Sequence, residues 1–178
     1  MDFLQLVNAR QSDRAYDKTR PVEAEKLERI LEAGRLAPSA CNAQPWKFVV
    51  VTDQELVQQV GKAAAGMGMN KFAKEAPVHI LIVEESANIT SALGSRIKNK
   101  HFPLIDIGIA AAYLTLAIES EGLGSCIVGW FDEKAMKKAV GIPDSKRLLL
   151  DIIVGYPTKE KKKKLRKDKE KVISYNKY

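Results

Sequence analysis

The sequence is poor in the residues that build disulfides, metal centres and proton-transfer sites. Its 178 residues include two cysteines, Cys41 and Cys126, and two histidines, His79 and His101. The cysteines stand far apart without CxxC spacing, so by themselves they form neither a disulfide framework nor a zinc site. An HExxH motif, a Walker loop, a GxSxG motif and a carboxylate pair are also absent. We therefore predict no metal and no catalytic side chain of these kinds.

Long hydrophobic runs are missing as well. The most apolar stretch, residues 107–118, is interrupted by Thr115. It is too short to span a bilayer and is typical of a buried core helix. The N-terminus lacks the basic and apolar regions of a secretory signal. We therefore expect a cytoplasmic protein in a reducing setting, with no membrane partner.

Positive charge is present but concentrated in one place. The net charge is +7, and residues 159–171 hold nine basic and three acidic residues, or +6, which leaves +1 for the rest of the chain. No aromatic residues interleave with these lysines, as single-stranded nucleic acid binding would require. We favour a solvated basic segment and predict no nucleic-acid partner, although a nucleic-acid-associated module using this segment stays open as an alternative.

Length and periodicity predict one mixed domain. A chain of 178 residues that is 46% hydrophobic can build one sizeable core, so residues 1–178 are expected to form a single domain. This domain includes the basic segment 159–171 and a C-terminal arm, residues 172–178. Helices are predicted after Asp2, Pro21 and Asp53 and over residues 104–121 and 132–140, with strands over residues 47–52, 78–83, 125–128 and 148–154. The order indicates an α/β fold, or α+β with one central sheet.

The segment after the first helix carries a pattern suited to a phosphate. In an extended segment Arg10, Ser12 and Arg14 project to the same side. Two guanidinium groups and a hydroxyl offer paired donors and permanent charge to an anion. A solvated turn is the alternative interpretation. Lys164 and Arg166 show the same two-residue spacing within the basic segment, where a phosphate or an extended polyanion would serve as ligand.

The loop of residues 37–46 is suited to a heterocycle. Pro38 and a second proline fix a short connection that carries Ser39, Asn42 and Gln44 between small residues. Carboxamides both donate and accept hydrogen bonds, so they match a ring edge that alternates C=O and N–H. The alternative is a polar connection whose Trp46 packs into the core.

The remaining glycine and histidine signals are weaker. Gly122 and Gly124 precede a strand instead of opening a helix, which argues against a dinucleotide fingerprint. Gly129 at the strand end can expose backbone donors, or it is a turn glycine. His79 is expected in the core and His101 at the surface. Donors for a phosphate and a heterocycle without acid–base machinery fit a cofactor that performs the chemistry itself.

In this order, the segments resemble the FMN-dependent nitroreductase family over almost the whole chain. The residues that carry the resemblance are Arg10-x-Ser12-x-Arg14, APSACNAQPW, EAPVHILIV, the helix with Asp106, GLGSCIVGWF, and the GYP turn followed by Lys164-x-Arg166 and VISYN. The resemblance implies an α+β, nitroreductase-like fold with a central, mainly antiparallel sheet flanked by helices. It also implies a homodimer with FMN at each subunit interface and a C-terminal tail exchanged between subunits.

The resemblance assigns roles to individual residues. The ribityl phosphate would be held by Arg10, Ser12, Arg14, Lys164 and Arg166. The isoalloxazine ring would be approached, partly from the opposite subunit, by Pro38, Ser39, Asn42 and Gln44. Backbone donors near flavin N5 and O4 would come from around Ile127 and Gly129.

The implied activity is a ping-pong oxidoreduction in which the flavin carries the chemistry. NADH or NADPH would pass hydride to flavin N5, and an electron-poor small molecule such as a nitroaromatic or quinone would then accept it. A non-catalytic flavin-binding or storage protein is the alternative. Gln11 departs from the family, which often has arginine there, and the short 86–103 region predicts an open pocket. Asn70 lies near a position that contacts flavin in some members.

Overall fold

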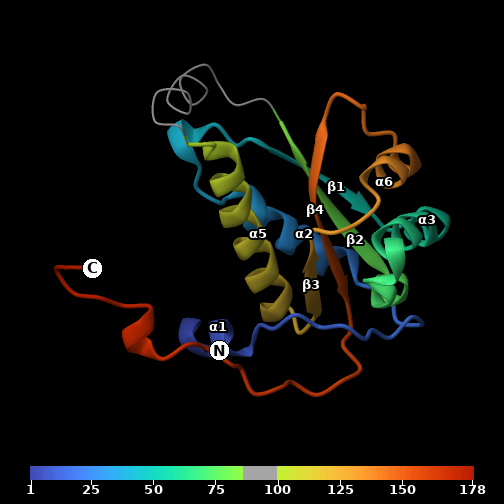
Figure 1. Cartoon of the computed structure of the whole chain (residues 1–178). Helices are drawn as coiled ribbons and strands as arrows, with labels where there is room; N and C mark the ends of the chain where they lie inside the picture. The colour runs from blue at the N-terminus through green and yellow to red at the C-terminus, as the bar shows by residue number, and fades with distance from the viewer. Residues whose placement is uncertain (86–99) are drawn as a thin grey trace.

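The fold is built on one antiparallel sheet. The computed structural model describes residues 1–85 and 100–178. In this part of the chain the strands are β1 (Trp46–Val51), β2 (Val78–Glu84), β3 (Gly124–Val128) and β4 (Arg147–Gly155). They lie in the order β1-β2-β4-β3, and each neighbouring pair is antiparallel (Figure 1). The expected α+β fold with a central antiparallel sheet is confirmed.

Helices cover both faces of this sheet. On one face lie α2 (Ala24–Arg35) and α5 (Phe102–Ser120), and on the other lie α3 (Gln54–Ala64) and α6 (Glu133–Val140) (Figure 1). Helix α1 (Phe3–Ala9) contacts α5. The short 3₁₀ turns are η1 (Ala40–Asn42), η2 (Gly66–Gly68), η3 (Lys71–Glu75) and η4 (Lys169–Lys171).

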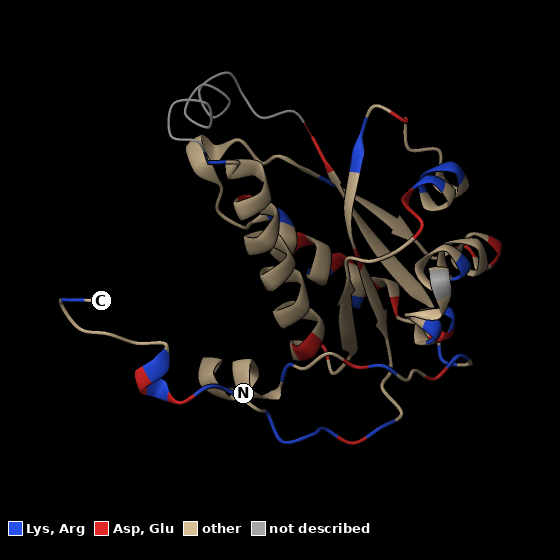
Figure 2. Ribbon diagram, viewed as in Figure 1, with Lys and Arg blue, Asp and Glu red and all other residues tan. Residues whose placement is uncertain are grey.

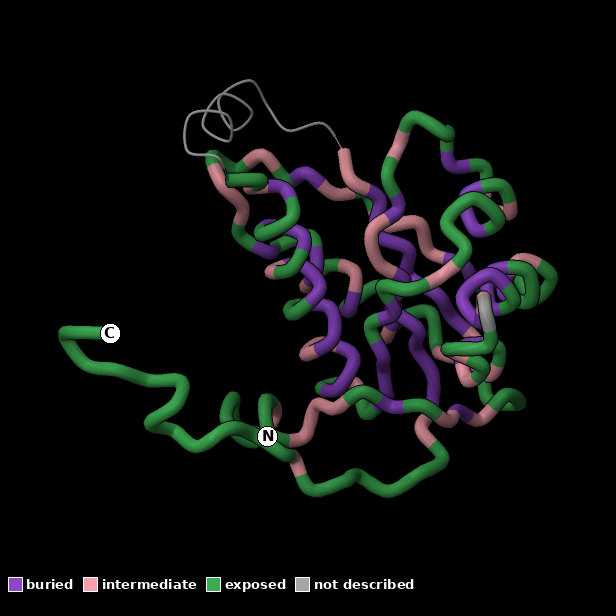
Figure 3. The backbone as a smooth tube through the Cα atoms, in the orientation of Figure 1, coloured by how far each residue is buried: buried purple, intermediate pink, exposed green. Residues whose placement is uncertain are grey.

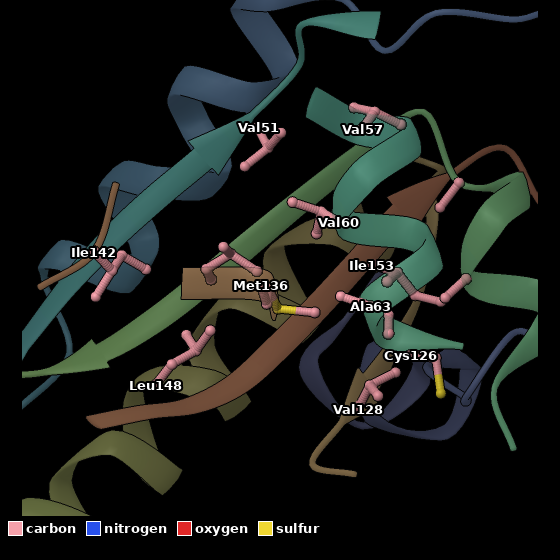
Figure 4. Packing of buried hydrophobic residues seen from close by; sticks show 14 of the residues in the cluster. Val51, Val57, Val60, Ala63, Cys126, Val128, Met136, Ile142, Leu148 and Ile153 are labelled. Carbon is pink, nitrogen blue, oxygen red and sulfur yellow. The ribbon is translucent and has the colours of Figure 1, made fainter. Parts of the chain in front are cut away.

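Strand β2 explains the continuous apolar run in the sequence, because both of its faces are covered. Val78, Ile80 and Ile82 pack towards α2 and α5, whereas Leu81 and Val83 pack towards α3 and α6. Side chains alternate between the two faces of a strand, so a strand buried on both faces has no polar repeat. Figure 4 shows the second of these clusters, where Met136 of α6 and Val60 of α3 meet the sheet.

Most of the described helices begin beside a side chain that can accept hydrogen bonds from the first main-chain N–H groups of the helix. Asp2 and Gln5 form a reciprocal capping box at the start of α1. Asp53 accepts hydrogen bonds from two main-chain N–H groups at the start of α3. Asp132 caps α6 by accepting one, from Ala135. Gly141 ends α6 with φ of 70°, a left-handed conformation that favours glycine. The expected caps at Asp2 and Asp53 are confirmed.

The prediction that Pro21 opens the second helix is wrong. Helix α2 begins at Ala24, since the backbone of the preceding Glu23 is extended, and the Tyr156 hydroxyl donates to the Glu23 carboxylate at 2.6 and 2.8 Å. Leu36 does not continue the apolar stripe of this helix. It is 61% exposed, since α2 has already ended at Arg35.

The central helix starts slightly earlier than its pattern indicates. Helix α5 begins at Phe102, with Pro103 in its first turn, where the ring removes no needed hydrogen bond. Most of the region interpreted as polar and partly loop, residues 86–99, lies outside the described residues. The 19 residues of α5 are long and apolar enough to cross a membrane by length and composition alone. However, α5 packs against α2 and against β2, β3 and β4, which is the position of a core helix.

A buried, hydrogen-bonded pair of side chains lies between β2 and β4. His79 Nδ1 and Asp151 Oδ2 are 2.8 Å apart, and both side chains are fully buried. The other two polar atoms of the pair, His79 Nε2 and Asp151 Oδ1, have no hydrogen-bond partner among the described residues. His79 is therefore a core residue, as expected, and its only polar contact there is Asp151. Each member of such a pair is tolerated in the core because of the other.

We expect His79→Leu to lower the free energy of unfolding by about 3–5 kcal/mol, because it leaves the Asp151 carboxylate buried without its partner. The double variant His79→Leu/Asp151→Leu should recover most of this loss, since it removes both polar groups. Urea unfolding of both variants measures the difference. A double variant less stable than the single one would contradict the expectation.

Candidate cofactor site

The extended segment after α1 is attached to the edge of the sheet. The main-chain N–H of Asp13 donates to Ser125 O at 2.8 Å, and Ser12 pairs with Ser125 in a parallel bridge. Tyr16 forms an antiparallel bridge with Pro157 just after β4, and its hydroxyl donates to Asp13 O at 2.7 Å. This attachment holds the segment with Arg10, Ser12 and Arg14 along β3.

The basic segment, together with Thr158 before it, is attached to the same N-terminal stretch of the chain. Thr158 N–H donates to Ala15 O at 3.2 Å, and Lys162 N–H donates to Gln11 Oε1 at 3.0 Å. The ammonium of Lys164 donates to Val7 O at 2.7 Å and to Arg10 O at 2.6 Å. Gln11, the departure from the family pattern, thus accepts a hydrogen bond that an arginine side chain, which has no acceptor, cannot accept.

These attachments create an open cleft of about 280 Å³ with cations on both sides. All five side chains predicted to hold a phosphate line it, although they come from opposite ends of the chain. The full set of lining residues is Arg10, Gln11, Ser12, Arg14, Lys162, Lys163, Lys164, Leu165 and Arg166. Burial, and then the nearby charges of Arg10 and Arg166, lower the pKa of Lys164.

The charge of this cleft is not balanced by acidic groups. In the part of the chain that the structure describes, no carboxylate forms an ion pair with Arg10, Arg14, Arg166 or any of the three lining lysines. Asp13, within the segment that lines the cleft, is buried and accepts from Gln11 Nε2 at 2.7 Å. Figure 2 shows the blue residues gathered along this segment near α1. The cleft can therefore attract an anion of more than one charge.

The free edge of β3 supplies backbone donors beside the cleft. Ser125 C=O points away from β4, since it accepts from Asp13. In a strand the N–H and C=O of one residue point the same way, and this direction repeats every second residue. The backbone groups of Ile127 therefore face the same open edge, and Gly129 follows at the strand end. Both residues are exposed, and a side chain added at Gly129 would meet only Leu150, at 3.8 Å.

Asn70 is tied to the end of β3. Its Nδ2 donates to Trp130 O at 2.8 Å and to Ala64 O at 3.4 Å. This holds the turn between α3 and β2 against the residue that follows Gly129. The neighbouring Phe72 ring lies 5.9 Å from the Arg14 guanidinium carbon. Asn70 carries only a loose signal in the sequence, because its partners are main-chain carbonyls, the shorter contact being to Trp130, 60 residues further along the chain.

The loop with Pro38 holds an unusual backbone. Cys41, Asn42 and Gln44 have φ of 52°, 50° and 46°, which is the left-handed region that favours glycine. Within the loop, Ser39 Oγ accepts from Gln44 N–H at 2.9 Å and Asn42 Oδ1 accepts from Gln44 Nε2 at 3.1 Å. Such conformations persist only where the surroundings impose them, and they cluster at functional sites.

Helix α5 separates this loop from the cleft. At its start, Asp106 is buried and its Oδ1 accepts from Ala40 N–H of the loop at 3.1 Å. At its end, Glu119 forms an ion pair with Lys161 of the basic segment. These two positions are 13 residues apart, or about 20 Å along a helix at 1.5 Å per residue. A single chain therefore does not bring Pro38, Ser39, Asn42 and Gln44 to the predicted phosphate residues.

Comparison with known proteins identifies the family. The family model described as "Nitroreductase family" matches residues 7–156. The chain belongs to the nitroreductase family. It is accordingly an oxidoreductase of that family.

Individual relatives agree with this assignment over nearly full length. The chain is 31% identical to an oxygen-insensitive NADPH nitroreductase of Helicobacter acinonychis, covering 96% of this chain and 95% of that one. It is 29% identical to an iodotyrosine deiodinase of Thermotoga neapolitana, covering 96% of each. A solved FMN-dependent nitroreductase from Clostridium difficile superposes with a TM-score of 0.80 at 27% identity. The match covers 99% of this chain and 100% of that chain.

Within residues 1–85 and 100–178, no group of three or more His, Cys, Asp or Glu side chains is placed to hold a metal ion. Cys41 is exposed and Cys126 is buried, and burial raises the pKa of the Cys126 thiol.

We expect Gly124→Ala to loosen the attachment beside the cleft. A Cβ at this position would lie 2.7 Å from Asp13 Oδ2 and 3.1 Å from Pro157 Cβ, and both neighbours are held by the attachment itself. The free energy of unfolding should fall by about 1–3 kcal/mol, and the Asp13 amide should exchange with solvent faster. Urea unfolding and amide exchange measure these effects. An unchanged exchange rate at Asp13 would show that the segment tolerates the methyl group.

Proposed function

We propose that this protein is an FMN-dependent oxidoreductase that transfers two electrons from NADH or NADPH to an electron-poor small molecule, such as a nitroaromatic or a quinone. The observation that carries the proposal is the cleft, where arginines and lysines that form no ion pair among the described residues lie beside the free backbone edge of β3. A cofactor with a phosphate at one end and a hydrogen-bonding ring at the other fits this set of donors. The nitroreductase relatives support the same assignment.

The protein residues have separate tasks in this reaction. Arg10, Ser12, Arg14, Lys164 and Arg166 would hold the ribityl phosphate, since they line one cleft. The backbone of Ile127 and Gly129 would donate to the N5 and O4 edge, where negative charge develops on reduction. When bound, FMN supplies the hydride chemistry, so no side chain is required as nucleophile. Overall, NAD(P)H, a proton and the oxidised acceptor would yield NAD(P)⁺ and the acceptor carrying two more electrons and two more protons.

The ring-binding residues would come from a second copy of this chain. Pro38, Ser39, Asn42 and Gln44 lie at the other end of α5 from the cleft, so a single chain leaves the site incomplete. The internal bond between Asn42 Oδ1 and Gln44 Nε2 leaves one donor group and one acceptor group for the ring edge. A two-fold dimer can bring the loop of one subunit to the cleft of the other.

Exposed apolar residues mark the surface that such a homodimer would cover. They belong to α1, to α5 and to the arm of residues 172–178, which extends away from the body in Figure 3. Exposed large apolar side chains in such number are typical of surfaces that contact another protein. The arm would lie over the partner subunit in an exchanged tail. These exposed residues are Phe3, Leu4, Val7, Leu104, Ile105, Tyr113, Val172, Ile173 and Tyr175.

The purified protein tests the proposal directly. We expect a flavin absorbance spectrum and oxidation of NADH or NADPH that depends on added acceptor. Bound FMN without turnover on a panel of nitroaromatics and quinones would favour a flavin-storage protein. Colourless protein that takes up no added FMN would overturn both functions. Strongly salt-dependent DNA or RNA binding, lost on deletion of residues 159–171, would instead support a nucleic-acid-associated module. We propose a cytoplasmic location, where the nicotinamide reductants are found.

We expect Arg14→Ala to weaken FMN binding by about tenfold or more, because one charge-assisted phosphate contact is worth at least 1.4 kcal/mol. Fluorescence titration of apoprotein with FMN measures the affinity. Arg35→Ala is the matched control, since Arg35 pairs with Glu32 on α2 and does not line the cleft. Equal affinity of Arg14→Ala and wild-type protein would remove Arg14 from the phosphate site.

Subunit mixing tests whether the site is shared. One variant carries Arg14→Ala/Arg166→Ala in the cleft, and the other carries Asn42→Ala/Gln44→Ala in the loop. If each site combines one cleft with one loop of the partner, the hybrid dimer has one intact site. Equal refolding mixtures should then recover about a quarter of the wild-type tight FMN sites, as counted by titration. No recovery in the mixture, although hybrid dimers form, would place both parts of the site in one subunit.

A further inference from the structure

The cleft holds more positive charge than one phosphate requires. Six cationic side chains line it, and none of them forms an ion pair with a carboxylate of the described residues. A phosphate monoester carries about two negative charges at neutral pH. The five residues already assigned to the FMN phosphate include four of the cations, which leaves Lys162 and Lys163 without a ligand.

The attachment of the basic segment keeps these two lysines at the rim. Lys161 and Lys164, on either side of them, turn towards the body. Lys161 pairs with Glu119 and donates to Ala9 O, and Lys164 donates to Val7 O and Arg10 O. By contrast, the ammonium groups of Lys162 and Lys163 have no hydrogen-bond or ion-pair partner in the described chain, and both residues are exposed and line the cleft.

Gln11 fixes the register that produces this division. Its Oε1 accepts the main-chain N–H of Lys162 at 3.0 Å, while its Nε2 donates to the buried Asp13 at 2.7 Å. The rim lysines are therefore positioned by a hydrogen-bonded anchor and are not simply part of a loose charged tail. The rest of the chain carries a net charge of only +1, so the positive field of the molecule is centred on this segment.

We infer that Lys162 and Lys163 form a second phosphate subsite at the rim of the cleft and that it selects NADPH over NADH. The inference rests on the proposed function, in which a nicotinamide dinucleotide enters beside the bound FMN. NADPH differs from NADH only by a phosphate on the adenosine ribose, so an additional pair of cations at the entrance discriminates between the two. The nitroaromatic and quinone acceptors need no such charge.

The test uses the FMN-loaded protein and two adenosine fragments that undergo no reaction. The probes are 2′,5′-ADP, which carries the extra phosphate of NADPH, and 5′-AMP, which lacks it. Calorimetry on wild-type holoprotein should show 2′,5′-ADP binding about tenfold tighter or more, since each charge-assisted contact is worth about a factor of ten. In Lys162→Gln/Lys163→Gln this preference should fall to within about twofold, with unchanged FMN content.

The control removes two lysines of the same kind elsewhere. Lys134→Gln/Lys138→Gln changes the net charge equally, but both residues are exposed on α6 and neither lines the cleft. This control should retain the wild-type preference, and only the rim variant should raise the KM for NADPH while kcat is unchanged. Wild-type holoprotein that binds both fragments equally, or a rim variant that keeps the preference, would overturn the subsite. Protein without FMN would instead overturn the proposed function on which it rests.

Discussion

The cationic cleft depends on the attachment of two distant chain segments to one end of the sheet. Ser125 O binds the Asp13 amide, and Tyr16 pairs with Pro157 after β4. As a result, the segment after α1 and the segment after β4 run side by side, and Gln11 joins them through Lys162. Burial, and then the like charges of Arg10 and Arg166, lower the pKa of Lys164, so bringing these two segments together has an electrostatic cost. Main-chain hydrogen bonds hold them together, and a bound anion would stabilise the arrangement further.

On the face covered by α3 and α6, the same sheet buries polar groups, which lowers its stability. His79 and Asp151 lie together in an apolar layer under α3 and α6, and each leaves one polar atom without a partner in the described structure. Well-packed apolar side chains often serve stability equally well at such positions. The loop with Cys41, Asn42 and Gln44 holds further strain in its left-handed backbone. In the proposed dimer this loop would meet the cofactor of the partner subunit, which gives the strain a functional reason.

Local chemistry made several features predictable. Asp2 and Asp53 cap helices because their short carboxylates reach main-chain N–H groups within one turn. The run of apolar residues 78–83 indicated the strand that the structure shows as β2. The start of α2 was not predictable in this way, since Glu23 is engaged by Tyr156 from the far end of the sequence. Nor was Asn70, whose partners are main-chain carbonyls that any residue could provide.

The sequence by itself determined the family, the α+β class and the chemical types of the candidate site, because these depend on residue identity and short spacing. Only the tertiary structure decided which of those residues lie close together. It joins Arg10, Ser12 and Arg14 to Lys164 and Arg166 in one cleft and puts α5 between that cleft and Asn42. The physical reason is that pairing with the edge of β3 brings distant segments together, whereas the length of α5 keeps the loop and the cleft apart. Neither is encoded in any single stretch of sequence.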